Sequence, residues 1–144
     1  DNLLKAGNTL TQRCFRTNKN EVIVKMNIEG MVDGQKAGLC HYSKSYAMVG
    51  VRPSGTDRNL EFQTNKEKIT GPAIKGNKVW IKSVWGLDGK SQFSYSTDGR
   101  KFTPFGEVYQ LEWGYYRGSR IGIYCLNNIA DAGYIDVDEF IYLY

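Results

Sequence analysis

The most constraining feature of this sequence is a two-residue alternation of apolar and polar side chains that recurs along most of its length. In the segment 21–30, Val22, Val24, Met26 and Ile28 fall on one face of an extended chain, and Glu21, Lys25, Asn27 and Glu29 fall on the other. Side chains two positions apart in an extended strand lie on the same face, so this pattern predicts a strand with one buried face. Helices need apolar residues three or four positions apart, and no segment shows that spacing convincingly. The alternation therefore favours a β protein.

Further segments with alternating or continuous apolar residues are separated by short turn sequences such as GTD, LDGK and TDGR. Short strands with a turn every ~8–12 residues and no helix are typical of an antiparallel sandwich or barrel, so the predicted fold class is all-β. The segment after Arg120 is apolar or small at nearly every position, which predicts a central strand covered on both faces. We expect strands at 9–15, 36–43, 45–53, 58–64, 78–85, 91–96, 101–106, 120–127 and 133–144.

Length and charge limit the classes of protein to consider. The 144 residues carry a net charge of +4, with 19 Lys and Arg against 15 Asp and Glu. This length is typical of one domain, so we expect residues 1–144 to form a single unit. The longest basic run is the pair Arg100-Lys101, so we expect no nucleic-acid partner. No apolar run is long enough for a transmembrane helix, so we expect no membrane partner.

The cysteines give little support for a metal site. Cys14, Cys40 and Cys125 show no C-x-x-C spacing, and His41 is the only histidine. A zinc site needs about four ligands, usually closely spaced in pairs. Each cysteine lies in an otherwise apolar strand pattern, which favours a small buried side chain. One disulfide bond is an alternative, and the odd number of cysteines leaves at least one free thiol.

The sequence FSYSTDGRKFTPFG, at residues 93–106, predicts a hairpin. Two alternating runs flank Asp98-Gly99, and glycine readily takes the positive φ that a tight turn needs. Aspartate in such a turn commonly accepts hydrogen bonds from nearby backbone amides. We therefore expect Asp98 to stabilise its own turn rather than to contact a substrate.

Two acidic residues near the C-terminus, Asp136 and Asp138, form the first candidate site. Because they are two positions apart in a predicted strand, they share a face at a spacing of roughly 6–7 Å. Calcium accepts several oxygen ligands, so the pair could bind calcium together with an acid on another strand, such as Glu21. A glycosidase acid and base can also have this spacing, but Phe140 occupies the next position on that face and Glu139 points to the other. The remaining alternative is a pair of surface or turn-capping acids without a ligand.

Trp80 is the basis of the second candidate site. In the predicted strand 78–85 it lies between Lys78 and Lys82 on one face, which favours contact with solvent. Sugar rings stack on exposed aromatic rings, and neighbouring polar groups bond their hydroxyls. The alternative for Trp80 is packing in the core or against another domain. A saccharide-binding surface would combine Trp80 with His41, Tyr46 and Gln92.

Six segments of the chain, taken in order, resemble the C-terminal β-sandwich domain of family 43 glycoside hydrolases, the β-xylosidases and arabinofuranosidases. Each segment alone is a simple strand or hairpin pattern, whereas their order and spacing together are specific for the family. The segments extend over essentially the whole chain. They are NTLTQR, DGQKAGLCHYSKSYAMVGV, KVWIKSVW, FSYSTDGRKFTPFG, YYRGSRIGIYCLNN and AGYIDVDEF.

The resemblance implies a jelly roll of two antiparallel sheets, similar to concanavalin A and laminin G domains, that follows a five-bladed catalytic propeller. The catalytic carboxylates would lie in that propeller, and we expect this chain to be a piece of the longer glycoside hydrolase. Asp136 and Asp138 take the positions of two acids in the family's closing strand, with structural calcium as a loosely implied ligand. Plant-polysaccharide substrates imply a secreted or periplasmic protein.

Three functions follow as hypotheses. The first is a non-catalytic accessory domain that packs against the propeller of a glycoside hydrolase acting on xylan- or arabinan-type substrates. The alternative is an independent carbohydrate-binding module that binds oligosaccharides at Trp80. A hydrolase in its own right, using Asp136 and Asp138, is the least favoured of the three.

Overall fold

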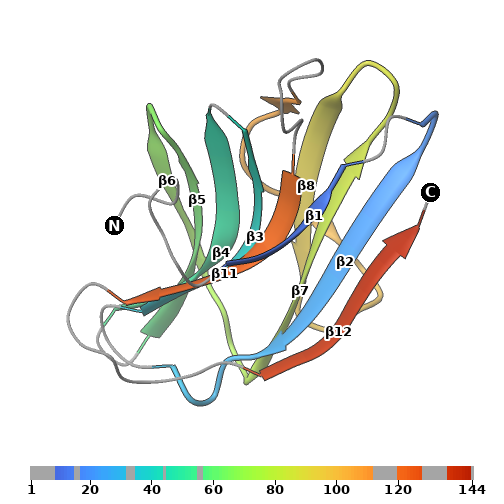
Figure 1. The fold of residues 1–144 in the computed structure, drawn as a ribbon. Helices are drawn as coiled ribbons and strands as arrows, with labels where there is room; N and C mark the ends of the chain where they lie inside the picture. Colours follow the sequence, from blue (N-terminus) through green and yellow to red (C-terminus); the bar gives the residue numbers. More distant parts are fainter. Residues whose placement is uncertain are drawn as a thin grey trace.

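The chain forms a sandwich of two antiparallel sheets that face one another (Figure 1). The computed structural model describes residues 9–14, 17–31, 35–43, 45–54, 57–111, 120–127 and 136–143, and these contain twelve strands and no helix. The predicted all-β sandwich is therefore confirmed. Within these ranges there is no helix that could span a membrane.

Each sheet contains six strands, and all of their pairings are antiparallel. The second sheet has five strands in sequence, with the short β9 paired to β8. The first sheet has the order β1 (Thr9–Arg13), β11 (Arg120–Asn127), β3 (Gln35–Tyr42), β4 (Tyr46–Ser54), β5 (Asp57–Thr64) and β6 (Lys68–Ala73). The second sheet has the order β10 (Tyr109–Gln110), β8 (Lys90–Ser96), β7 (Lys78–Trp85), β2 (Asn20–Asn27) and β12 (Asp136–Leu143), with β9 at Thr103–Pro104.

The core lies between the two sheets and is built by the alternation read from the sequence. On β2, Val22, Val24 and Met26 are fully buried, and the residues between them are partly exposed, as predicted. Each buried side chain of this size contributes roughly 1.5–3 kcal/mol through the apolar surface removed from water. The opposite sheet contributes Leu39, Val49, Leu60, Phe62 and Ile121 to the same cluster.

The strand 120–127, which is β11, lies inside the sheet as predicted, because it pairs with β1 on one side and with β3 on the other. The strand predictions were wrong at three places on the sheet margins. The expected strand 101–106 is reduced to the residue pair Thr103–Pro104, the strand 68–73 was not expected, and the short β10 at Tyr109–Gln110 was not expected either. The second error arises because Gly71 and Pro72 resemble a loop sequence, although proline is tolerated on an outer strand such as β6.

The hairpin at Asp98-Gly99 has the predicted turn. Gly99 has a φ of 79°, and the Oδ1 atom of Asp98 accepts hydrogen bonds from the backbone amides of Arg100 at 2.8 Å and Lys101 at 3.1 Å. These amides lower the pKa of Asp98 to about 2, because they favour the ionised carboxylate. Asp98 thus stabilises its own turn.

The three cysteines are free thiols rather than partners in a disulfide bond. Cys14 and Cys40 are buried, which confirms their interpretation as small buried side chains, whereas Cys125 is partly exposed. Burial raises the pKa of Cys14 to about 12 and also raises that of Cys40. Both buried thiols are therefore protonated near neutral pH.

Candidate functional site

The predicted saccharide-binding surface is not assembled, because its four residues lie in three different places. Trp80 and Gln92 share the outer face of the second sheet, the face that points away from the first sheet. They lie four positions apart along paired strands, which corresponds to roughly 13 Å. Tyr46 is buried on the outer face of the first sheet, and His41 is buried in the core. The expectation that these residues form one surface is therefore wrong.

His41 belongs to a hydrogen-bonded chain inside the core. Its Nε2 atom lies 2.6 Å from the hydroxyl of Ser83, which lies 2.7 Å from the hydroxyl of Ser91. Its Nδ1 atom lies 3.5 Å from the sulfur of Cys14, and its ring packs edge-on against Trp85. Burial lowers the pKa of His41 to about 3, because the charged imidazole would lose its hydration. The histidine is neutral, inaccessible and part of the packing.

Trp80 is half-buried by its neighbours on the outer face of the second sheet. The ammonium of Lys25 lies 5.3 Å from the ring centroid, close enough for a cation–π contact. The hairpin turn also contacts the ring, since a Cβ atom added at Gly99 would lie 2.9 Å from its Cε2 atom. Packing explains the position of Trp80, and sugar stacking on its ring stays a prediction.

The candidate acids of β12 do not follow the expected alternation, because the strand contains a bulge. The pairing with β2 advances by one residue between Val137 and Glu139, so Asp138 is the extra residue. Asp136 pairs with an outer-face position of β2, as does Glu139, whereas Phe140 pairs with a core position. The prediction that Asp136, Asp138 and Phe140 share a face is therefore wrong.

Glu21 lies far from the two aspartates. It pairs with Leu143, five positions along β12 from Asp138, which corresponds to roughly 16 Å. Its carboxylate contacts the ammonium of Lys82 at 3.7 Å. No group of three or more His, Cys, Asp or Glu side chains in the described ranges is placed to hold a metal ion. Glu21 thus does not share a site with Asp136 and Asp138, and calcium binding by those two stays a prediction.

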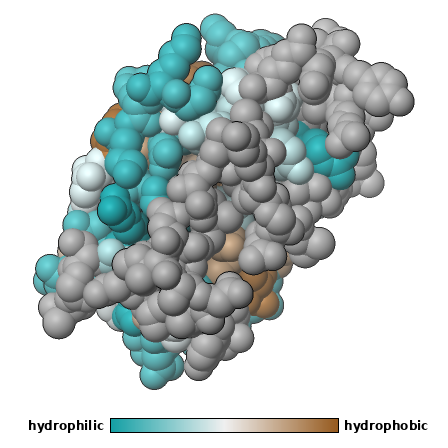
Figure 2. Space-filling view, turned by 60° about the vertical axis from the view of Figure 1, so that its left-hand side comes forward, coloured by the Kyte–Doolittle hydropathy of each residue, from teal (hydrophilic) through white to brown (hydrophobic). Residues whose placement is uncertain are grey.

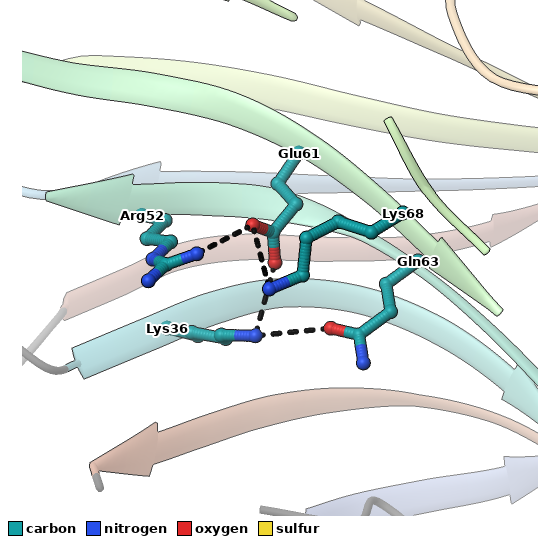
Figure 3. Close-up of polar contacts among 5 residues, drawn as sticks. All are labelled: Lys36, Arg52, Glu61, Gln63 and Lys68. Atoms are coloured by element: carbon teal, nitrogen blue, oxygen red, sulfur yellow. Dashed lines mark hydrogen bonds and ion pairs between the residues drawn. The ribbon is translucent and has the colours of Figure 1, made fainter. Parts of the chain in front are cut away.

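A cluster of four charged side chains and one amide that was not predicted from the sequence lies on the outer face of the first sheet (Figure 3). This Glu61 cluster comprises Lys36 of β3, Arg52 of β4, Glu61 and Gln63 of β5, and Lys68 of β6. On β5 the two polar residues flank a buried phenylalanine, so the alternation directs them outward. Four neighbouring strands thus bring the five residues together.

Three cations surround the carboxylate of Glu61, whose side chain is only 8% exposed. Its Oε1 atom lies 3.1 Å from the ammonium of Lys36, and its Oε2 atom lies 3.4 Å from Arg52 and 3.8 Å from Lys68. Lys36 also donates a hydrogen bond to Gln63 at 2.9 Å. A carboxylate removed from water needs such partners, since an unpaired buried charge costs several kcal/mol.

The Glu61 cluster has an excess of positive charge. Glu61 favours the charged form of Lys68, but partial burial and the charges of Lys36 and Arg52 act in the opposite direction. The net result is a lowered pKa for Lys68. The single carboxylate therefore does not balance the three cations around it.

A cavity of about 210 Å³ opens beside this cluster. Arg52 and Asn59 form a cross-strand pair, as do Glu61 and Thr70, so the register of β4, β5 and β6 places their polar groups together. Such convergent polar groups are able to bind the hydroxyl and charged groups of a small ligand. The lining residues are Arg52, Asn59, Leu60, Glu61 and Thr70.

Two glycines form part of the same outer face. Tyr124, Gly38, Gly50 and Glu61 form a row of cross-strand pairs, and Tyr124 is buried. A Cβ atom added at Gly50 would overlap the hydroxyl of Tyr124 and the carbonyl oxygen of Ala37. Burial raises the pKa of Tyr124 well above its usual value, and nearby groups that include Glu61 add to this effect. The glycines therefore make the space in which the tyrosine side chain packs.

A larger cavity, of about 720 Å³, contains Tyr46 but none of the other predicted saccharide-binding residues. The carboxyl group of Glu107 raises the pKa of Glu67 there, mainly through a hydrogen bond between the two groups. The charge of Glu107 adds to this effect. Glu67 is exposed, so water screens this interaction. None of the charged lining residues is buried, in contrast to Glu61. The lining residues are Ser45, Tyr46, Thr64, Asn65, Lys66, Glu67, Glu107, Val108, Tyr109 and Gln110.

Sequence comparison relates nearly the whole chain to one domain family, described as the β-xylosidase C-terminal concanavalin A-like domain, which matches residues 2–143. A β-xylosidase from Formosa agariphila is 32% identical over 142 residues, which cover 97% of this chain and 24% of that protein. A putative β-xylosidase from Xylanibacter ruminicola is 29% identical over 133 residues, covering 92% of this chain and 24% of that protein. This chain spans about a quarter of the length of these curated relatives.

Solved structures show the same fold. A bifunctional GH43-CE protein of Bacteroides eggerthii superposes with a TM-score of 0.87 at 24% identity, over 99% of this chain and 20% of that one. An engineered GH43 glycoside hydrolase with endo-xylanase and exo-arabinofuranosidase activity gives a TM-score of 0.82 at 22% identity, over 94% of this chain and 31% of that one. The shared part is again a minor fraction of a longer chain.

Proposed function

This chain belongs to the family of C-terminal concanavalin A-like domains of β-xylosidases, and from this premise we propose that it is a non-catalytic accessory domain that packs against a family 43 catalytic propeller. Its relatives are larger GH43 chains in which the domain sits with a catalytic domain. The proposal places the hydrolysis of xylan- or arabinan-type substrates in that other domain. It also places the protein outside the cell or in the periplasm, where such polysaccharides are found.

The observation that carries the packing proposal is a set of exposed apolar side chains on β12. Val137 is 41% exposed, Phe140 36%, Ile141 39% and Leu143 52%. These are four of the six large hydrophobic side chains that are exposed in the described part of the chain. Apolar groups collected on an outer strand promote association unless another surface covers them.

The register of β12 shows how a partner would cover these side chains. Ile141 pairs with Ile23 and Leu143 with Glu21, both on the outer face of the second sheet. Phe140 pairs with Val24 and is core-facing, but its position on the last strand of the sheet order leaves it partly open. A catalytic domain placed against β12 would therefore bury both the outer face and the free side of this strand.

The bulge at Asp138 supports a non-catalytic role. A glycosidase mechanism on β12 would need two carboxylates held on one face at a defined spacing. The extra residue interrupts the alternation on which that spacing depends. Turnover of substrate is therefore assigned to carboxylates of the catalytic domain.

The proposal is tested by producing this chain and the catalytic domain of its glycoside hydrolase separately and mixing them. We expect a complex in analytical ultracentrifugation, and hydrolysis of aryl xylosides or arabinofuranosides only in samples that contain the catalytic domain. The double substitution Ile141→Glu and Leu143→Glu should weaken the complex at least about tenfold, because it places charges in an apolar contact.

Leu87 provides a matched control, since it is 51% exposed and lies outside β12. Leu87→Glu should leave the affinity within about twofold. Hydrolysis by this chain alone would contradict the non-catalytic role. A complex of unchanged affinity after the β12 substitutions would contradict the proposed contact surface.

A further inference from the structure

We propose that the cavity beside the Glu61 cluster binds an anionic saccharide, with Arg52 contacting its charged group and Asn59, Glu61 and Thr70 contacting its hydroxyls. The shared chemistry is a sugar ring that carries a carboxylate or a sulfate ester. This inference goes beyond the accessory role, because it assigns a ligand to a surface remote in sequence and strand order from β12.

The distribution of charge identifies the cations that remain for a ligand. Lys36 and Glu61 are both buried and lie 3.1 Å apart, so one buried cation already neutralises the buried carboxylate. Arg52 and Lys68 make longer contacts to Glu61, at 3.4 and 3.8 Å, and their side chains are 49% and 42% exposed. Glu61 thus needs only Lys36 for neutrality, and two reachable positive charges are left over.

Arg52 is suited to contact the charged group. Its guanidinium has five N–H donors in a planar fork that matches the oxygens of carboxylates and other oxyanions. In the described part of the chain its only hydrogen bond is the one from Nη1 to Glu61. Lys68 adds a second positive charge beside the carboxylate of Glu61. The lowered pKa of Lys68 is consistent with repulsion among the cations, which an anion would relieve.

The volume and lining of the cavity indicate a sugar ring rather than a bare ion. The cavity has a volume of about 210 Å³, below the roughly 300–1,000 Å³ of pockets for drug-sized ligands, so it suits one ring. The Asn59 amide and Thr70 hydroxyl supply both donors and acceptors beside the carboxylate of Glu61. Hydroxyl groups of a sugar need this combination, whereas an inorganic anion needs only donors.

The pairing of the backbones of β5 and β6 is irregular beside the cavity. Asn59 pairs with Ala73 and Glu61 with Thr70, so β6 has one extra residue in the intervening stretch that contains Gly71 and Pro72. Such irregularities are enriched at sheet edges and beside binding sites. The described residues on the side of the molecule that carries β5 and β6 are mainly hydrophilic (Figure 2). The cavity therefore lies on a polar surface where the strand pairing is interrupted.

The binding test uses the intact chain in NMR titrations with glucuronic acid, glucose 6-sulfate, uncharged glucose, sodium acetate and sodium sulfate. We expect saturable shifts of the amide signals of β5 and β6 with at least one of the two anionic sugars. Binding of glucose should be at least about tenfold weaker, and binding of the anionic sugar should weaken with added salt. Glucuronic acid alone would identify a uronate site, and glucose 6-sulfate alone a sulfated-sugar site.

Substitutions locate the site. Arg52→Gln should weaken binding at least about tenfold, and Thr70→Val a few-fold, with the fold verified by the NMR spectrum. Arg100→Gln is the matched control, because Arg100 is an exposed cation on the hairpin turn outside the cavity. Should Arg52→Gln fail to fold, Lys68→Gln replaces it, since Lys68 is the more weakly held cation.

Three results would overturn the proposal. The first is an absence of saturable binding by both anionic sugars. The second is equal binding of acetate or sulfate and the anionic sugars, which would indicate a simple anion site. The third is a response to Arg100→Gln as large as the response to Arg52→Gln or Lys68→Gln.

Discussion

The two outer faces of the sandwich differ in how their side chains are accommodated. On the first sheet, Met48 and Tyr124 are each 3% exposed, and the carboxylate of Glu61 has three cationic partners. On β12 of the second sheet, Ile141 is 39% and Leu143 is 52% exposed. Met48, Tyr124 and Glu61 on the first face are thus packed within this chain, whereas the β12 face exposes apolar groups for which a partner domain is proposed.

The two faces should therefore respond differently to substitution. On the first face, adding a group overlaps a neighbour and removing one leaves a neighbour unpaired or beside empty space, so either change should lower the free energy of unfolding. Replacing an apolar group on β12 removes few contacts within the chain, so folding should be little affected while association changes. Measurements on isolated variants can therefore separate the two faces.

The largest effect is expected for Gly50→Ala on the first face. The new methyl group would overlap the carbonyl oxygen of Ala37 and the hydroxyl of Tyr124, and backbone cannot move away cheaply. We expect a loss of about 4 kcal/mol in the free energy of unfolding, measured by urea denaturation. Gly76→Ala is the control, since Gly76 has a φ of 91° but no neighbour within 4 Å. Its loss should be about 1 kcal/mol, and equal losses would contradict the proposed packing.

The next effect is expected for Glu61→Gln. This change leaves Lys36 buried without a carboxylate, so the free energy of unfolding should fall by about 3 kcal/mol. Glu139→Gln on β12 is matched in chemistry but exposed, and should change stability by less than about 0.5 kcal/mol. A small effect at both positions would show that the Glu61 cluster contributes no more than a surface ion pair.

In the core between the two faces, His41 is expected to make the free energy of unfolding depend on pH. The histidine has a pKa of about 3 in the folded state against 6.5 as its ordinary value, so between these pH values only the unfolded state binds the proton. Stability should therefore fall as the pH is lowered from 6.5 towards 3, at up to about 1.4 kcal/mol per pH unit, and this contribution should be constant above 6.5.

The measurement compares urea denaturation of the wild type and His41→Asn between pH 7 and 4.5. Carboxylates titrate in both proteins, so the difference between the two pH profiles isolates the histidine. The wild type should lose roughly 2–3 kcal/mol more than the variant over this range. Parallel profiles would show that His41 is accessible to protons in the folded protein.

Much of the fold could be predicted from single strands, because burial follows a local period of two. The alternation assigned Val22 and Val24 to the core and placed the turn at Asp98-Gly99. The same logic could have placed His41 inside, since it lies two positions from Leu39 on β3. The prediction of a surface position for His41 relied on the common occurrence of histidine in binding sites, and it was wrong because the side chain is fully buried.

The candidate site could not be predicted in the same way, because it depends on which strands pair. Glu61 lies 25 positions from Lys36, and β3 and β5 are brought together only through β4. The bulge at Asp138 was also invisible, because an extra residue is defined by the partner strand rather than by its own sequence. Strand order and register are non-local, and a single sequence without an alignment contains little information about them.

The smallest effect on stability is expected on β12, whose apolar side chains are proposed to contact a partner domain rather than this chain. Leu143→Lys adds a charge to a side chain that is 52% exposed, so the free energy of unfolding should change by less than about 0.5 kcal/mol. Met48→Lys places the same group where only 3% of the side chain is exposed, and should cost at least about 3 kcal/mol. Light scattering of the isolated chain should show less self-association for Leu143→Lys, because the substitution interrupts the apolar surface of β12. If Leu143→Lys instead destabilises the chain as much as Met48→Lys, β12 is packed within the chain and is not available to a catalytic domain.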